Sequence, residues 1–172
     1  MISASDILDA KVLIVDDEAA NVLLLEEMLR DAGYGRVSST MDPRAVVELH
    51  RSQSYDLILL DLQMPGLDGF QVIEGLKTIK ADGYLPVLVI TAQPGHKLRA
   101  LQAGAKDFVA KPFDILEVKT RIHNMLEVRL LYKALEQTVE KRTAELRESE
   151  ARFHALREMA GFCAQIRRTS RS

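Results

Sequence analysis

Carboxylate, hydroxyl and ammonium side chains follow four short apolar segments of this sequence, each at the point where the segment ends. Asp16 and Asp17 follow "KVLIV", Asp61 follows "LILL", Thr91 follows "LPVLVI" and Lys111 follows "DFVA". Segments of this kind are typical of strands buried on both faces of a sheet. If the strands are parallel, their carboxyl ends meet at one edge, which is where open α/β sheets bind their ligands.

These residue types suggest phosphoryl chemistry. Three carboxylates at one edge repel one another unless a cation lies among them, and oxygen ligands with open coordination positions suit Mg²⁺. A cation and a nearby lysine can offset the charge of a phosphoryl group while one carboxylate attacks it as nucleophile. Asp61 is presented at a strand exit, just before the turn at Met64–Gly66. We therefore expect Asp61 to be the carboxylate that is phosphorylated.

The elements that must position these residues alternate regularly along the chain. Five apolar segments are separated by helical patterns, which predicts a (βα)5 α/β fold with a parallel sheet and helices on both faces. The pattern of residues leaves the order of the strands open. The predicted strands cover 11–15, 35–40, 57–60, 85–90 and 107–110.

The last helical pattern is much longer than the others. No Pro or Gly occurs between Asp114 and Gly161, and from Met125 onward the apolar residues follow a heptad repeat. This predicts a coiled coil, most simply a parallel homodimer. The alternative is one long amphipathic helix that folds back on its own domain. The predicted seam residues are Met125, Val128, Tyr132, Leu135, Val139, Leu146, Phe153 and Leu156.

Composition narrows the class of protein. The net charge of −2 argues against nucleic-acid binding, although residues 1–114 carry 11 basic and 17 acidic side chains and residues 115–172 carry 12 and 8. The single cysteine, Cys163, indicates a reducing compartment. There is neither a long apolar span nor a signal sequence, so we expect a cytoplasmic location and no membrane partner.

Four stretches resemble the receiver domain of two-component response regulators: "VLIVDDE", "DLILLDLQMPGLDG", "VLVITA" and "DFVAKPF". The resemblance covers about residues 9–127. It implies a flavodoxin-like doubly wound sheet with strand order 2-1-3-4-5, whose fifth helix here extends into the long coiled coil. The expected domains are a receiver at 1–127, a coiled-coil signalling helix at 128–160 and a basic, disordered tail at 161–172.

The resemblance also assigns a role to each residue at the predicted edge. Asp61 is the expected phosphoacceptor. Asp17, Asp61 and the backbone carbonyl of Gln63 are expected to ligate Mg²⁺ directly, and Asp16 largely through water. Lys111 is expected to pair with the phosphoryl group.

Three further expectations concern the switch between conformations. The resemblance implies a cis peptide bond between Lys111 and Pro112. Thr91 should form a hydrogen bond with a phosphoryl oxygen. Phe108 occupies the position of the switch aromatic residue, where it lacks the ring hydroxyl of a tyrosine.

The implied function is signal transduction by a phosphorelay. A histidine kinase or phosphotransfer protein would donate the phosphoryl group, and the conformational change would act through the dimeric coiled coil. This role predicts that the protein is not an enzyme. The alternatives are a Mg²⁺-dependent phosphohydrolase, disfavoured by Gln63 at the usual position of an acid/base Asp, and a dimerisation scaffold that is not phosphorylated. The stretch "ESEARFHAL", which resembles the helix before PAS domains, leaves open whether the chain is the front part of a longer protein.

Overall fold

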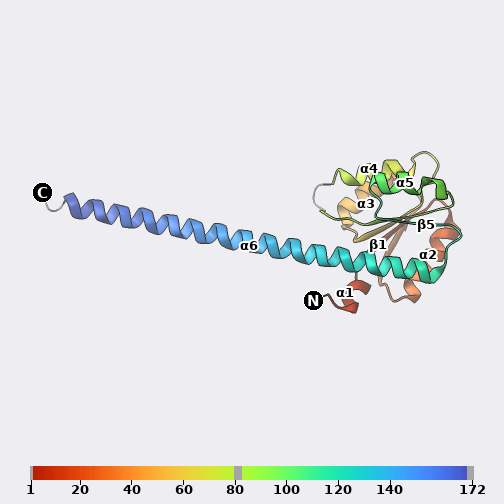
Figure 1. The fold of residues 1–172 in the computed structure, drawn as a ribbon, viewed down its shortest axis with the longest axis horizontal. Helices are drawn as coiled ribbons and strands as arrows, with labels where there is room; N and C mark the ends of the chain where they lie inside the picture. Colours follow the sequence, from red (N-terminus) through yellow and green to blue (C-terminus); the bar gives the residue numbers. More distant parts are fainter. Residues whose placement is uncertain (1, 80–82, 170–172) are drawn as a thin grey trace. The chain divides into compact units, whose positions relative to one another are not determined.

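The structure is a computed structural model that describes residues 2–79 and 83–169. Helices and strands alternate through most of this range (Figure 1). In chain order the elements are α1 (Ala4–Leu8), β1 (Lys11–Val15), α2 (Ala19–Asp31), β2 (Arg36–Thr40), the 3₁₀ helix η1 (Pro43–Ala45), α3 (Val46–Gln53), β3 (Leu57–Leu60), α4 (Gly69–Lys77), β4 (Val87–Thr91), the 3₁₀ helix η2 (Pro94–His96), α5 (Lys97–Ala103), β5 (Asp107–Ala110) and α6 (Ile115–Thr169).

Within the described residues, five strands form one parallel sheet in the order β2-β1-β3-β4-β5. The predicted flavodoxin-like fold is therefore confirmed. β1 and β3 are neighbours, and Val15 lies opposite Leu60, so the chain leaves both strands at the same level. β4 and β5 pair in the same way, with Thr91 opposite Ala110. This register brings the ends of four strands to one edge.

The sheet is covered on both faces by helices. Figure 1 shows α3, α4 and α5 on one side and α2 with the first part of α6 on the other. Alternate strand residues pack into the two layers because successive side chains of a strand point to opposite faces. In β1, Val12 and Ile14 pack in the α2–α6 layer, whereas Leu13 and Val15 pack in the layer of α3, α4 and α5. The continuous apolar segments in the sequence reflect this burial on both faces.

Two local features differ from the sequence-based expectations. A short helix, α1, precedes β1 and was not predicted; Ser3 caps it in a reciprocal pair with Asp6, and its Ile7 is buried in the core. β4 begins at Val87 rather than at Leu85. Pro86 has no backbone N–H to give to a ladder, although its carbonyl accepts a hydrogen bond from the Ile58 N–H.

The chain divides into two units, Met1–Tyr132 and Lys133–Ser172. The first, which we name the globular unit, extends past the predicted boundary at residue 127. Met125, predicted to be a seam residue, is buried in the core of the globular unit instead. It belongs to the stripe of Val118, Ile122 and Leu126, which packs against the sheet.

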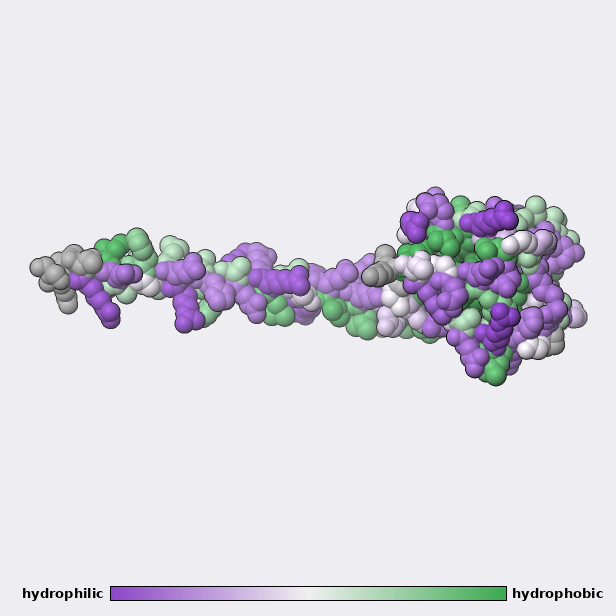
Figure 2. Space-filling model, turned by 90° about the horizontal axis from the view of Figure 1, so that it is seen from above, coloured by the Kyte–Doolittle hydropathy of each residue, from purple (hydrophilic) through white to green (hydrophobic). Residues whose placement is uncertain are grey.

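The second unit, which we name the helical unit, is described as a continuation of α6 to Thr169. The tail predicted to be disordered at 161–172 is therefore helical as far as Thr169, and residues 170–172 lie outside the described part. Arg167 and Arg168 in the last turn complement the negative end of the helix dipole. Hydrophobic surface recurs along this helix among hydrophilic side chains (Figure 2). Among the described helices, none combines the length and the apolar character that crossing a membrane requires.

Candidate functional site

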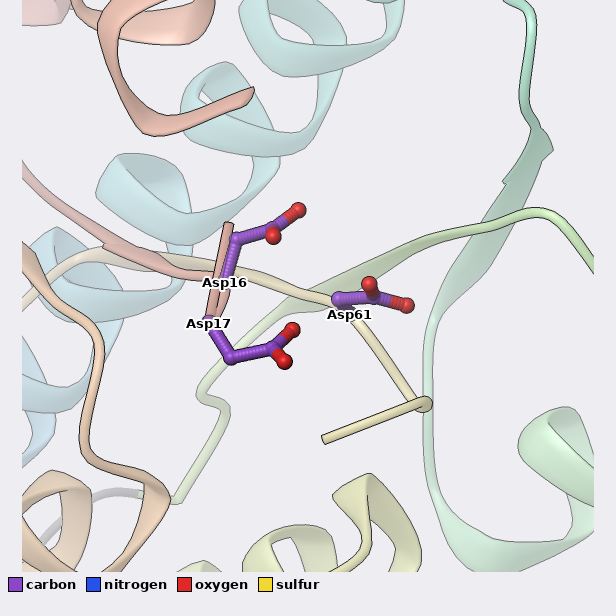
Figure 3. Close-up of side chains that lie close together, drawn as sticks. All are labelled: Asp16, Asp17 and Asp61. Carbon is purple, nitrogen blue, oxygen red and sulfur yellow. The ribbon is translucent and has the colours of Figure 1, made fainter. Parts of the chain in front are cut away.

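Three carboxylates gather where β1 and β3 end. Asp16 and Asp17 follow β1 and Asp61 follows β3; Figure 3 shows their side chains grouped around a common space. One carboxylate oxygen from each residue lies within 4.8 Å of the others. Asp16 and Asp61 are buried and Asp17 is exposed. We name this end of the sheet the carboxyl-terminal rim; it consists of Asp16, Asp17, Asp61, Thr91 and Lys111.

Lys111 joins two of these carboxylates. Its Nζ donates hydrogen bonds to Asp16 Oδ2 at 2.8 Å and to Asp61 Oδ2 at 3.1 Å. Burial by itself lowers the pKa of Lys111, but the hydrogen bonds and the charges of the two carboxylates outweigh it, so the pKa is raised. The ammonium therefore stays charged at neutral pH. One cation among three carboxylates leaves the rim with an excess of negative charge.

Backbone and side-chain donors orient the two buried carboxylates. Asp16 Oδ1 accepts hydrogen bonds from the Glu18 N–H at 2.9 Å and from Asn21 Nδ2 at 3.3 Å. Asp61 Oδ1 accepts one from the Gln63 N–H at 3.1 Å. Each carboxylate thus has one oxygen held by its own loop, while the other oxygen faces Lys111.

A glycine lets helix α4 approach the site. A Cβ on Gly69 would lie 2.8 Å from the Asp61 carbonyl oxygen and 2.8 Å from Leu62 Cα, closer than atoms normally pack. The Gly69 N–H donates to the Leu62 carbonyl at 3.1 Å. The loop that carries Asp61 is therefore fixed between the end of β3 and the first turn of α4.

Thr91 is the last residue of β4, Phe108 lies in β5, and the Lys111–Pro112 peptide bond follows β5. The Thr91 side chain is fully buried, and its Oγ1 has no hydrogen-bond partner among the described residues. Phe108 is buried in the core layer of α3, α4 and α5. The peptide bond between Lys111 and Pro112 is cis.

The rim offers the donor chemistry that Mg²⁺ prefers. Carboxylate oxygens from three side chains are close enough to surround one ion, and hard divalent cations favour oxygen ligands. The buried Thr91 hydroxyl needs a partner, because a buried polar group without a hydrogen bond is destabilising. The residues present therefore fit a cation and an oxygen-rich group at this edge.

The structure brings together four of the side chains that sequence reasoning placed at this edge, Asp16, Asp17, Asp61 and Lys111, and it places Thr91 at the end of the neighbouring strand β4. The geometry also shows residues that sequence reasoning missed, namely Asn21 and Gly69. Asn21 shows no signal in the sequence, because its role depends on a contact across the first turn of α2. Gly69 follows the helix-capping residue Asp68, and that position was the available signal for a close approach.

The chain thus combines a doubly wound parallel sheet with a cluster of three carboxylates at the carboxyl-terminal ends of its strands. The model of the response regulator receiver domain matches residues 12–123, so the chain belongs to that family.

Similar proteins span several kinds of regulator. The chain is 35% identical over 161 residues to Response regulator PleD of Caulobacter vibrioides, which covers 92% of this chain and 33% of that protein. It is 32% identical over 116 residues to Chemotaxis protein CheY of Bacillus subtilis, which covers 67% of this chain and 97% of that protein. A solved receiver domain of sensor histidine kinase PA1611 from Pseudomonas aeruginosa PAO1, with magnesium coordinated in its active-site cleft, matches with a TM-score of 0.64 and 31% identity over 69% of this chain and 98% of that chain.

These matches correct one expectation. The chain spans about a third of PleD and about half of Transcriptional activator protein IrlR of Burkholderia pseudomallei, but nearly all of CheY. The matches therefore cover a receiver domain, which occurs in proteins of different length and organisation. The prediction that the protein is not an enzyme was wrong, because it extended the properties of a receiver domain to a whole protein.

Proposed function

We propose that the chain accepts a phosphoryl group on Asp61 in a Mg²⁺-dependent reaction and transmits the change to α6. The observation that carries this proposal is Lys111, which bridges Asp16 and Asp61 beside a third carboxylate. The phosphodonor would be a phosphohistidine of a histidine kinase or phosphotransfer protein, as in other two-component systems. A cytoplasmic location belongs to the same proposal, because the one cysteine forms no disulfide within the chain.

Asp61 acts as the nucleophile. One carboxylate oxygen attacks phosphorus, so that a P–O bond forms while the P–N bond to the donor imidazole breaks and its electron pair returns to the ring nitrogen. The Gln63 N–H holds the other oxygen and keeps the carboxylate oriented. Because Asp61 is already a carboxylate, no general base is needed to activate it.

Asp16, Asp17, Asp61 and the carbonyl of Gln63 would hold Mg²⁺, which when bound offsets the charge of the transferring phosphoryl group. The Lys111 ammonium is available to pair with a new phosphoryl oxygen, since it already contacts Asp61 Oδ2. The Thr91 hydroxyl can donate to another oxygen, because it has no partner among the described residues. Movement of Thr91 would then open or close the space beside Phe108, its proposed partner in the switch.

An intact-mass measurement tests the acceptor. The full chain is incubated with acetyl phosphate and Mg²⁺, and the fraction carrying one phosphoryl group is compared between wild type and Asp61→Asn. We expect modification of the wild type only, and none when EDTA removes Mg²⁺. Asp68→Asn is the matched control, because it removes a carboxylate from the same loop while an asparagine can still cap α4. Equal modification of wild type and Asp61→Asn would refute the assignment.

For the helical unit we propose a second copy of this chain as the partner. The predicted seam residues within the helical unit are between 55 and 66% exposed, namely Leu135, Val139, Leu146, Phe153 and Leu156. Leaving such side chains in water forfeits roughly 1.5–3 kcal/mol each, which a parallel coiled coil would recover in part. The heptad spacing fits an identical helix, because each seam position then meets its own counterpart.

The native cysteine provides a test that needs no added label. Cys163, the one cysteine of the chain, lies seven residues after the seam residue Leu156. It therefore occupies the same heptad position and belongs to the predicted seam. In a parallel dimer in register, mild oxidation should join two chains through Cys163. The control variant combines Cys163→Ser with Glu158→Cys, which moves the thiol to the outer face of the helix. Oxidation should not link two chains of this variant. An absence of Cys163 linkage in the wild type would contradict the parallel dimer.

A further inference from the structure

The strands that end at the carboxyl-terminal rim begin in a second group of polar contacts at the opposite end of the sheet. We name this group the amino-terminal rim. Four of its members stand at or just before the starts of β1, β3, β4 and β5, and two come from α6. They are Lys11, Asp56, Tyr84 and Lys106, together with Arg129 and Tyr132.

Arg129 ties α6 to the starts of two strands. Its side chain is 2% exposed, an unusual degree of burial for an arginine. Its Nε lies 3.8 Å from Asp56 Oδ1, and its guanidinium donates a hydrogen bond to the Tyr84 carbonyl. Asp56 is also buried, and its Oδ2 accepts a hydrogen bond from the Lys11 N–H at 3.0 Å. Three strands and one helix thus share a single buried ion pair.

Aromatic rings extend the same group. The rings of Tyr84 and Tyr132 stack with their centroids 5.4 Å apart and an angle of 27° between their planes. Lys106 Nζ lies 5.1 Å from the centroid of the Tyr84 ring. Tyr132 is the last residue of the globular unit, so these contacts fix α6 at its final residues in that unit.

Single strands of the sheet connect the two rims directly. Lys11 and Asp16 bound one strand, Asp56 and Asp61 a second, and Lys106 and Lys111 a third, five residues apart in each case. β4 connects Tyr84 to Thr91 in the same direction. A displacement of β3 or β4 at one rim therefore moves a contact of α6 at the other, because Asp56 and Tyr84 are the partners of Arg129 and Tyr132.

We propose that the amino-terminal rim is the coupling site through which the state of the phosphoryl site sets the position of α6. Arg129 and Tyr132 are its positioning residues on the helix, and Asp56 and Tyr84 are their partners on the sheet. This proposal depends on the proposed function for its signal. Linkage requires the coupling to work in both directions, so loosening the amino-terminal rim also changes the phosphoryl site.

Hydrogen exchange of the full chain tests the proposal. Amide exchange over residues 126–139 is measured with Mg²⁺, with and without acetyl phosphate, while intact mass reports phosphorylation in the same samples. The test variant is Asp56→Asn with Arg129→Gln, which removes both charges and keeps polar partners. The matched control is Glu148→Gln with Arg152→Gln, which removes an ion pair between two residues of α6 and leaves the contacts with the strand starts in place.

In the wild type we expect phosphorylation to change the amide exchange rates of residues 126–139 by about fivefold or more. A factor of about five is at the lower end of the coupling usually found between two sites. The test variant should be phosphorylated but lose this change, and the control should retain it. A test variant that keeps the change, or a control that loses it, overturns the coupling site alone. A wild type that is not phosphorylated overturns the proposed function, and this proposal with it.

A second variant guards against misfolding. If far-ultraviolet circular dichroism shows that the test variant is unfolded, Tyr132→Leu takes its place, because it removes the ring stacking and leaves the buried ion pair intact. Tyr132→Leu should then be phosphorylated and lose the change in exchange, as expected of the first test variant. Retention of the full response in Tyr132→Leu overturns the proposal.

Discussion

The two rims of the sheet are built from the ends of the same strands, yet their charges are arranged differently. At the carboxyl-terminal rim, three carboxylates lie close together, and the one ammonium among them, that of Lys111, contacts only Asp16 and Asp61. At the amino-terminal rim, the carboxylate of Asp56 lies beside the guanidinium of Arg129, and both are buried. An excess of negative charge favours the binding of a cation, whereas a matched buried pair is sensitive to the loss of either partner, because the other charge is then left uncompensated.

The largest expected effect comes from unbalancing the amino-terminal rim. Asp56→Ala leaves the Arg129 guanidinium buried without this carboxylate, and we expect a loss of about 3–5 kcal/mol in the free energy of unfolding. The double variant Asp56→Asn with Arg129→Gln should lose less, because no charge is left uncompensated. Urea unfolding measures both. Equal losses in the two proteins would show that the charge balance is unimportant there.

The next effect tests how tightly the carboxyl-terminal rim is packed. Gly69→Ala places a methyl group 2.8 Å from the Asp61 carbonyl oxygen, so we expect a loss of about 1–3 kcal/mol in unfolding free energy. Gly95→Ala is the control, since a Cβ there has nothing within 4 Å. Thermal unfolding of the two variants gives the comparison. A Gly69→Ala protein as stable as the control would mean that α4 can move away at little cost.

Neutralising one carboxylate at the carboxyl-terminal rim should increase the free energy of unfolding when no cation is present, whereas the substitutions above decrease it. In EDTA, Asp17→Asn should raise the free energy of unfolding by up to about 1 kcal/mol, because it relieves repulsion at an exposed position. In Mg²⁺ the variant should instead be less stable than wild type, since a proposed ligand is gone. Melting temperatures in the two buffers report the difference. The same sign of change in both buffers would argue against an excess of charge that a cation relieves.

The smallest effect concerns Tyr84 at alkaline pH. Burial raises the pKa of its phenol above 10.0, and the charge of Arg129 lowers it by a smaller amount. The folded state thus favours the neutral phenol, so this contribution to stability is complete below pH 10 and is lost as the pH rises through the raised pKa. Tyr84→Phe should lose stability less steeply than wild type above pH 10. If the free energy of unfolding fell equally steeply with pH in the two proteins, this prediction would be wrong.

Much of the carboxyl-terminal rim was predictable because its signals are local. A run of apolar residues that ends in Asp61 or Asp16 indicates both a buried strand and a polar group at its exit. Parallel pairing then requires such groups to meet at one edge. The order of the strands followed from the resemblance to the receiver family, because the residues alone do not specify it.

The amino-terminal rim was not predictable in the same way. Arg129 lies 45 residues from Tyr84 along the chain, and the polar side chain of Asp56 before a strand is an ordinary feature of a turn. Met125 shows a related difficulty. A helix that packs on a sheet and a helix that packs on a partner use similar spacings of apolar residues, so the heptad pattern could not show where one role ends.

The length of the strands limits how a phosphoryl group can influence α6. Five residues of extended chain span roughly 17 Å between the rims. At that distance, and with an effective dielectric constant of 20, two unit charges interact by only about 1 kcal/mol. Direct attraction between a new negative charge at Asp61 and the Arg129 guanidinium is therefore comparable with a coupling of about fivefold between the rims, and the strands must carry any response that exceeds it.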